Sequence, residues 1–126
     1  MIEFLADDYD IWGGYMIHKD WVYKKLQYVQ AYCSGIKPVA YVGEPMGKLI
    51  FNMKHDDKEV GWNGFKVKMD KHIPIGFVVI YSKRNNWRVK RPVSWCSVMQ
   101  FGDCSDRDKE IMSRILLRNL KEGIDI

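Results

Sequence analysis

The chain has 126 residues, of which 47% are hydrophobic and 13% aromatic, which suits one folded domain spanning residues 1–126. This composition excludes a disordered chain, which would be poor in aromatic residues. The net charge of +4 is uneven. Residues 1–63 carry seven Lys/Arg and nine Asp/Glu, whereas residues 64–126 carry thirteen and seven, so we expect an anionic partner to bind the C-terminal half.

Two features of the sequence indicate where the protein works. No apolar run approaches the roughly 18 residues that span a bilayer, so no membrane contact is expected. The first eight residues are acidic and lack the basic start of a secretion signal, which predicts a cytoplasmic protein. The odd number of cysteines agrees with this location and predicts free thiols, mostly buried: Cys33, Cys96 and Cys104.

The first clear element is a helix from about Trp21 to Cys33. Asp20 is a suitable N-cap, and Gly35 stands where a helix-ending glycine belongs. The predicted core stripe of this helix consists of Val22, Leu26, Val29 and Cys33.

Five segments with strand patterns follow this helix, at residues 38–42, 48–54, 60–69, 73–81 and 87–101. Asn63-Gly64 is a tight-turn pair, so the third segment is expected either as one strand or as two strands divided at this pair. Segment 73–81 is apolar on both faces, which predicts a central strand covered on both sides. Residues 82–86 are expected to form a hairpin loop, and the last strand is expected to bend at Pro92.

The last element is a helix that begins after Ser105, a suitable N-cap, and ends at Gly123. The order of the elements predicts the α+β class. Because the connections are short, we expect an antiparallel sheet of about four to six strands. The N-terminal and C-terminal helices are expected to pack together on one face of this sheet.

Apolar and basic residues alternate one by one in residues 65–69 and 87–90, which predicts that one sheet face carries Lys66, Lys68, Arg88 and Lys90. A basic face suits the backbone of a nucleic acid or another anionic surface, although an ordinary solvated face gives the same pattern. Most aromatic residues have the opposite parity, so contact with the backbone alone is expected, without base stacking. The full predicted site is Lys66, Lys68, Lys83, Arg84, Arg88, Lys90, Arg91, Arg114 and Arg118.

A second hypothesis is a protein-binding inhibitor or adaptor, of the accessory type that viruses and mobile elements encode. It rests on aromatic residues outside the predicted core stripe and on an acidic N-terminal loop, because Tyr and Trp are enriched in interface hot spots. The residues of this alternative site are Asp8, Asp10, Trp12, Tyr15, Tyr23 and Tyr28.

Catalysis is a third and weaker hypothesis. A metal-dependent hydrolase would need clustered acids near a lysine, for example Asp56, Asp57 and Glu59 with Lys66 or Lys68. No metal-ligand spacing or glycine-rich phosphate loop is present, so neither a metal nor another cofactor is expected. If segment 87–101 is an open edge strand, it offers a surface on which a second copy could form a homodimer.

Overall fold

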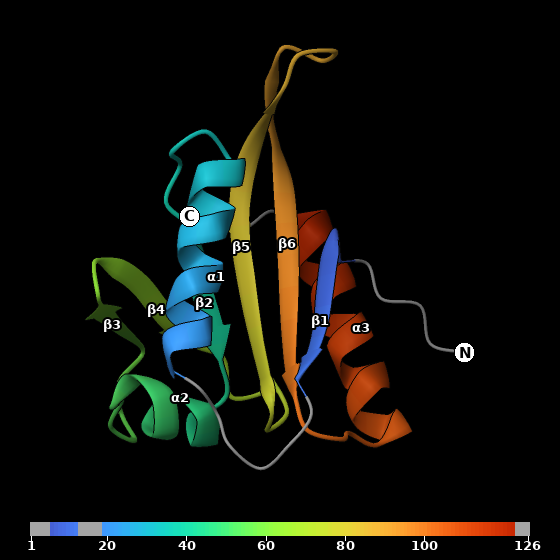
Figure 1. Cartoon of the computed structure of the whole chain (residues 1–126). Coiled ribbons are helices and arrows are strands. Elements are labelled where there is room, and N and C mark those ends of the chain that lie inside the picture. Colours follow the sequence, from blue (N-terminus) through green and yellow to red (C-terminus); the bar gives the residue numbers. More distant parts are fainter. Residues whose placement is uncertain (1–5, 13–18, 123–126) are drawn as a thin grey trace.

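The computed structural model of the chain describes residues 6–12 and 19–122. Within these ranges the elements follow one another as β1 (Asp8–Trp12), α1 (Lys19–Tyr32), β2 (Val39–Val42), α2 (Glu44–Phe51), β3 (Glu59–Trp62), β4 (Phe65–Met69), β5 (Phe77–Asn86), β6 (Arg91–Phe101) and α3 (Asp106–Glu122) (Figure 1). No helix in this part of the chain combines the length and apolar character needed to cross a bilayer.

Several predicted elements are confirmed. Helix α1 buries Val22, Leu26 and Val29, as its periodicity predicted. The Asn63-Gly64 pair separates β3 from β4, with both residues at positive φ. Ser105 caps α3, because its Oγ accepts a hydrogen bond from the backbone N–H of Asp108 at 3.1 Å. The cysteines are free: Cys33 and Cys96 are buried and Cys104 is half-buried.

The six described strands form one mixed sheet in the order β1-β6-β5-β2-β4-β3. The α+β class is confirmed, but the purely antiparallel pairing is wrong, because β1 runs parallel to β6 and β2 runs parallel to β4. The chain leaves β2 through α2, returns in the opposite direction as β3 and reverses again at Asn63-Gly64, so β4 runs in the same direction as β2. Strand β1 pairs with β6 over Ser97–Phe101, so segment 87–101 is not an open edge there.

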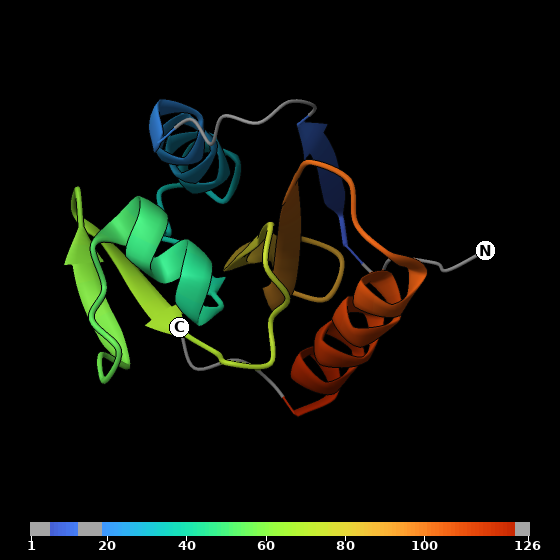
Figure 2. The same ribbon diagram turned by 90° about the horizontal axis from the view of Figure 1, so that it is seen from below.

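The helices cover opposite faces of the sheet, so their expected placement on one face is wrong. Val78 and Ile80 of β5 pack in the same cluster as Leu26 of α1 and Met46 of α2. Phe77, Val79 and Tyr81 point the other way and pack against residues of α3 such as Leu116. Figure 2 shows α1 and α2 on one side of the strands and α3 on the other. A strand that is apolar on both faces, as β5 is, requires this double cover.

Helix α2 replaces the strand predicted for residues 48–54. Its buried residues, Met46, Gly47, Ile50 and Phe51, have helical spacing, and Pro45 lies in its first turn, where proline is tolerated. The preceding Gly43 lies so close to the chain that an added Cβ would be 2.3 Å from the carbonyl oxygen of Ile73. Glycine is therefore required where β2 leads into α2.

The connection between β5 and β6 also differs from the prediction. Strand β5 continues through residues 82–86, and the turn is formed by Trp87–Lys90, which were expected to be strand. The Oδ1 atom of Asn86 holds this turn by accepting the backbone N–H groups of Arg88 at 2.9 Å and Val89 at 3.4 Å. Lys90 closes the turn with a φ of 54°.

Beyond Tyr81 of β5 and Cys96 of β6, no other described strand lies beside these two, and they pair with each other from Ser82↔Trp95 to Asn86↔Arg91. The part of this extension beyond the buried pair Ser82 and Trp95, residues 83–94, is called the hairpin arm below. Figure 1 shows that it projects past the rest of the sheet and past the ends of the helices. Both of its broad sides can therefore meet a partner.

Candidate functional site

The basic residues predicted to share one face occupy separate places. Lys66 and Lys68 lie in β4, whereas Arg88 and Lys90 lie in the turn of the hairpin arm. The expected single basic face is therefore absent among these four residues. Two other predicted residues, Arg114 and Arg118, lie in α3.

The predicted cations outside the arm are mostly engaged with acidic side chains. Lys68 stands opposite Glu59 in the β3–β4 pair, and its Nζ lies 6.0 Å from the ring centroid of Tyr41. The other three form ion pairs: Lys66 with Glu59 at 3.8 Å, Arg114 with Glu110 at 2.5 Å and Arg118 with Asp70 at 3.3 Å. A phosphate would have to compete with these carboxylates.

The hairpin arm contains the other five predicted cations, all of them exposed: Lys83, Arg84, Arg88, Lys90 and Arg91. None of the five forms an ion pair within the described part of the chain. The sequence has no Asp or Glu between Asp70 and Asp103, so the arm has no acidic residue of its own. The arm is therefore a projecting ribbon with five positive charges, no negative charge and no ion pair among the described residues.

Apolar side chains accompany these charges at the tip of the arm. Trp87 is 80% exposed and Val89 is 50% exposed. The guanidinium carbon of Arg88 lies 5.2 Å from the ring centroid of Trp87, a cation–π distance. The alternation in the sequence had assigned Trp87 and Val89 to the core, and the turn instead presents both to solvent.

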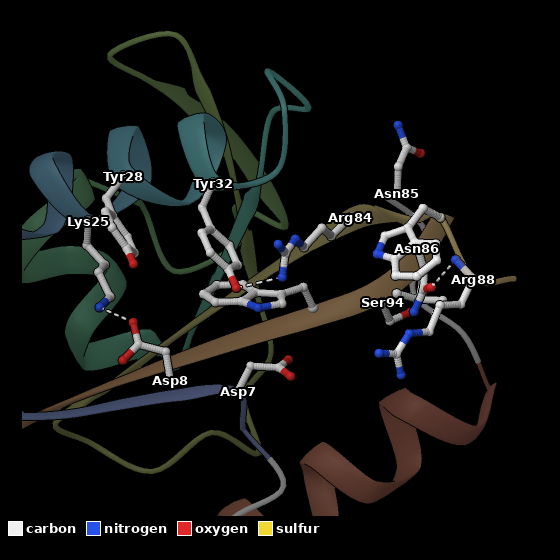
Figure 3. A pocket seen from close by; sticks show the side chains of 13 residues that line it. Asp7, Asp8, Lys25, Tyr28, Tyr32, Arg84, Asn85, Asn86, Arg88 and Ser94 are labelled. Atoms are coloured by element: carbon white, nitrogen blue, oxygen red, sulfur yellow. Dashed lines mark hydrogen bonds and ion pairs between the residues drawn. The ribbon is translucent and has the colours of Figure 1, made fainter. Parts of the chain in front are cut away.

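A groove of about 840 Å³ lies between the hairpin arm, α1 and the start of β1 (Figure 3). Tyr28 and Tyr32 point into it from α1, and Asp7 and Asp8 lie on the opposite wall. The remaining lining comes from Lys25, Arg84, Asn85, Asn86, Trp87, Arg88, Val93, Ser94 and Trp95.

One wall of the groove is aromatic. Tyr28 and Tyr32, four residues apart on one side of α1, stack with ring centroids 6.0 Å apart and an interplanar angle of 14°. The Tyr32 ring also contacts Trp95, with centroids 5.2 Å apart. Arg84 joins this row: its guanidinium carbon lies 4.2 Å from the Tyr32 centroid, and its NH1 group donates a 2.6 Å hydrogen bond to the Tyr32 hydroxyl. Since Tyr28 is 53% exposed and Tyr32 is 38% exposed, the wall is accessible.

The opposite wall is acidic, and one lysine offsets part of its negative charge. Lys25 of α1 forms ion pairs with Asp8 and with Asp10, the latter at 2.6 Å. Burial alone would lower the pKa of Lys25, but the hydrogen bonds and charges of Asp10 and Asp8 outweigh it and raise that pKa. Asp7 differs, because its Oδ2 accepts the backbone N–H of Cys96 at 2.8 Å and no described cation forms an ion pair with it.

The surface predicted for protein binding is largely used within the fold. Trp12 packs against Trp21 with ring centroids 4.9 Å apart and the ring planes tilted by 35°, and Tyr23 is half-buried against core aromatics. Tyr28 belongs to the groove, and Tyr15 lies outside the described residues. The described geometry therefore gives this alternative little free surface.

The residues considered for hydrolysis have structural contacts. The Oδ2 atom of Asp57 accepts the backbone N–H of Lys54 at 2.8 Å, and Glu59 is paired with Lys66. Within the described ranges, no group of three or more His, Cys, Asp and Glu side chains is arranged to hold a metal ion.

Comparisons of the chain with models of protein families, with curated proteins and with solved structures find no match. The function must therefore be inferred from the arm and the groove themselves.

Proposed function

We propose that the protein binds nucleic acid through the hairpin arm. The observation that carries the proposal is the concentration of five exposed cations, without an ion pair among the described residues or an acidic neighbour in sequence, on one projecting ribbon, whereas Lys66, Arg114 and Arg118 already hold carboxylates. A lysine or arginine that takes part in no ion pair can bind a phosphate without first losing another charged partner. Each such contact releases counterions from the nucleic acid, which supplies most of the affinity for a polyanion.

The shape of the arm supports the same function. A two-stranded β-ribbon is narrow enough to enter the major groove of a duplex or to lie along a single strand. The exposed indole of Trp87 adds a flat surface at the tip on which a base can stack. Arg88 lies beside that indole, so charge and stacking surface reach a partner together. The proposed activity is binding and needs no cofactor.

The test compares two triple variants that remove the same positive charge from different places. The arm variant carries Lys83→Gln, Lys90→Asn and Arg91→Gln. Asparagine replaces Lys90 because it tolerates the left-handed backbone at that position. The control variant carries Lys66→Gln, Arg114→Gln and Arg118→Gln. Each variant lowers the net charge by three, so any difference in binding depends on where the charge lies.

Binding is measured by fluorescence anisotropy with a labelled oligonucleotide of about 16 nucleotides, the upper end of the site size of a small binding domain. We expect the arm variant to bind at least about tenfold more weakly than the wild type at low salt, and the control to bind nearly as tightly. Equal losses in the two variants would contradict the proposal. Binding to vesicles of anionic lipid without binding to nucleic acid would also contradict it.

A further inference from the structure

The groove beside the hairpin arm has the size and position of a ligand site. Its volume of about 840 Å³ lies within the usual range for small-molecule sites, about 300–1,000 Å³. Arg84 and Arg88 belong both to the cationic arm and to the groove lining. A strand held on the arm by its phosphates would therefore have its bases next to the groove.

The aromatic wall suits a flat, unpaired ring. Tyr28 and Tyr32 point into the groove, and the guanidinium plane of Arg84 lies against Tyr32 (Figure 3). Aromatic rings and arginine planes are the surfaces on which proteins stack the bases of single strands. A base inside a duplex is already stacked and paired, so only an unpaired base can use this wall.

The acidic wall determines which part of a nucleotide can enter. Because the Asp7 carboxylate on this wall forms no ion pair with a described cation, a phosphate is repelled from this wall and attracted to Arg84 and Arg88 on the arm side of the groove. A carboxylate accepts hydrogen bonds from the amino and imino groups of a base. Guanine presents two such donors side by side, at N1 and N2, and so matches a carboxylate best. In thymine and uracil the only ring donor stands between two carbonyl oxygens, which a carboxylate repels.

From this arrangement we infer that the groove holds one unpaired base of a single-stranded nucleic acid and prefers guanine, with Asp7 accepting its N–H groups. The inference rests on the proposed function of the arm, which supplies the phosphate contacts. It goes further by assigning a second binding site, a preference for single-stranded over duplex nucleic acid and a preference for one base.

The test uses single strands of about ten thymidines in which one central base is replaced by guanine, adenine or cytosine. We expect the wild type to bind the guanine-containing strand at least about fivefold more tightly than the all-thymidine strand. In Asp7→Asn, the side-chain oxygen can still accept the N–H of Cys96, so the fold is retained while the charge is lost. Its affinity for every strand is expected to rise because one negative charge is removed, and its guanine preference is expected to fall below about twofold.

A second pair of variants tests the aromatic wall. Tyr28→Ala removes an exposed ring and is expected to weaken single-strand binding several-fold while leaving duplex binding unchanged. Tyr28→Phe keeps the ring and is expected to bind as the wild type does. Equal binding of all four strands, or a guanine preference that survives in Asp7→Asn, would overturn the inference. If only the arm variant changed binding, the function of the arm would stand without the base site, whereas absence of any binding would refute both.

Discussion

The salt dependence of binding gives the sharpest test of the hairpin arm. If all five arm cations meet phosphates of a single strand, the logarithm of the affinity should fall with the logarithm of the salt concentration with a slope of about −3.5, or about −0.7 per contact. The arm variant keeps Arg84 and Arg88 only, so its slope should be about −1.4. Between about 50 and 200 mM salt, the wild type should therefore lose about 100-fold in affinity and the arm variant about sevenfold.

Anisotropy titrations at four or more salt concentrations measure these slopes directly. The control variant, which lacks Lys66, Arg114 and Arg118, should keep the slope of the wild type, because each of these cations already neutralises a carboxylate. A wild-type slope near zero would refute electrostatic binding to nucleic acid. An arm-variant slope equal to that of the wild type would show that the phosphates bind elsewhere. Thermal unfolding of each variant checks that the fold survives.

Two further predictions concern the framework that holds the arm and the groove. Lys25→Met should lower the free energy of unfolding by about 1–3 kcal/mol, because the carboxylates of Asp8 and Asp10 then face each other without a cation. The pKa of Lys25 is raised above its usual 10.5 in the fold, so its contribution is complete below pH 10.5 and is lost at higher pH. Urea unfolding should then show the variant's deficit shrinking in strong alkali, and a constant deficit would contradict this assignment. Gly43→Ala should cost about 1–3 kcal/mol, measured by thermal unfolding, because its Cβ would meet the Ile73 carbonyl; a wild-type melting temperature would contradict the close approach.

Local signals predicted the elements that depend on local chemistry. Helix α1 follows from the spacing of Val22, Leu26 and Val29, and α3 follows from its Ser105 cap. The turn between β3 and β4 follows from Asn63-Gly64. Each of these features is complete within a few residues, so no distant partner is needed to recognise it.

Helix α2 was missed because its hydrophobic pattern fits both the two-residue period of a strand and the 3.6-residue period of a helix. In residues 48–54, alternation places Leu49 with Phe51 and Met53 on one side, as in a strand. The fold instead buries Ile50 beside Phe51 and leaves Leu49 exposed, which is helical spacing. Packing against the sheet selects the helix over the strand, and the residues within this segment do not indicate that packing. The same limit explains the parallel pairing of β1 with β6, whose residues are almost ninety positions apart in the chain.

The hairpin arm was misplaced for a different reason. Four residues of alternating character, Trp87 to Lys90, predict a strand as readily as an exposed tight turn. The short turn depends on Asn86, whose side chain bonds two backbone N–H groups, and asparagine before an apolar residue is a weak signal by itself. The long stretch without acidic residues, between Asp70 and Asp103, did carry the relevant information about charge. All five predicted cations within that stretch lie in the arm, whereas the other four predicted cations lie in β4 and α3.

The placement of charge around the groove also orients the proposed partner. Lys25 offsets one of the two negative charges of Asp8 and Asp10 and forms no ion pair with Asp7, so negative potential remains on one wall, opposite the aromatic row. Arg84 lies where the groove meets the arm. Its guanidinium donates a hydrogen bond to the Tyr32 hydroxyl, and its backbone belongs to the part of β5 that forms the arm. A strand with its phosphates turned toward Asp7 would meet repulsion, whereas the reverse orientation puts the phosphates on the arm and a base in the groove. The two proposals therefore require one and the same orientation of the strand, and base preference should disappear whenever the arm no longer holds the phosphates.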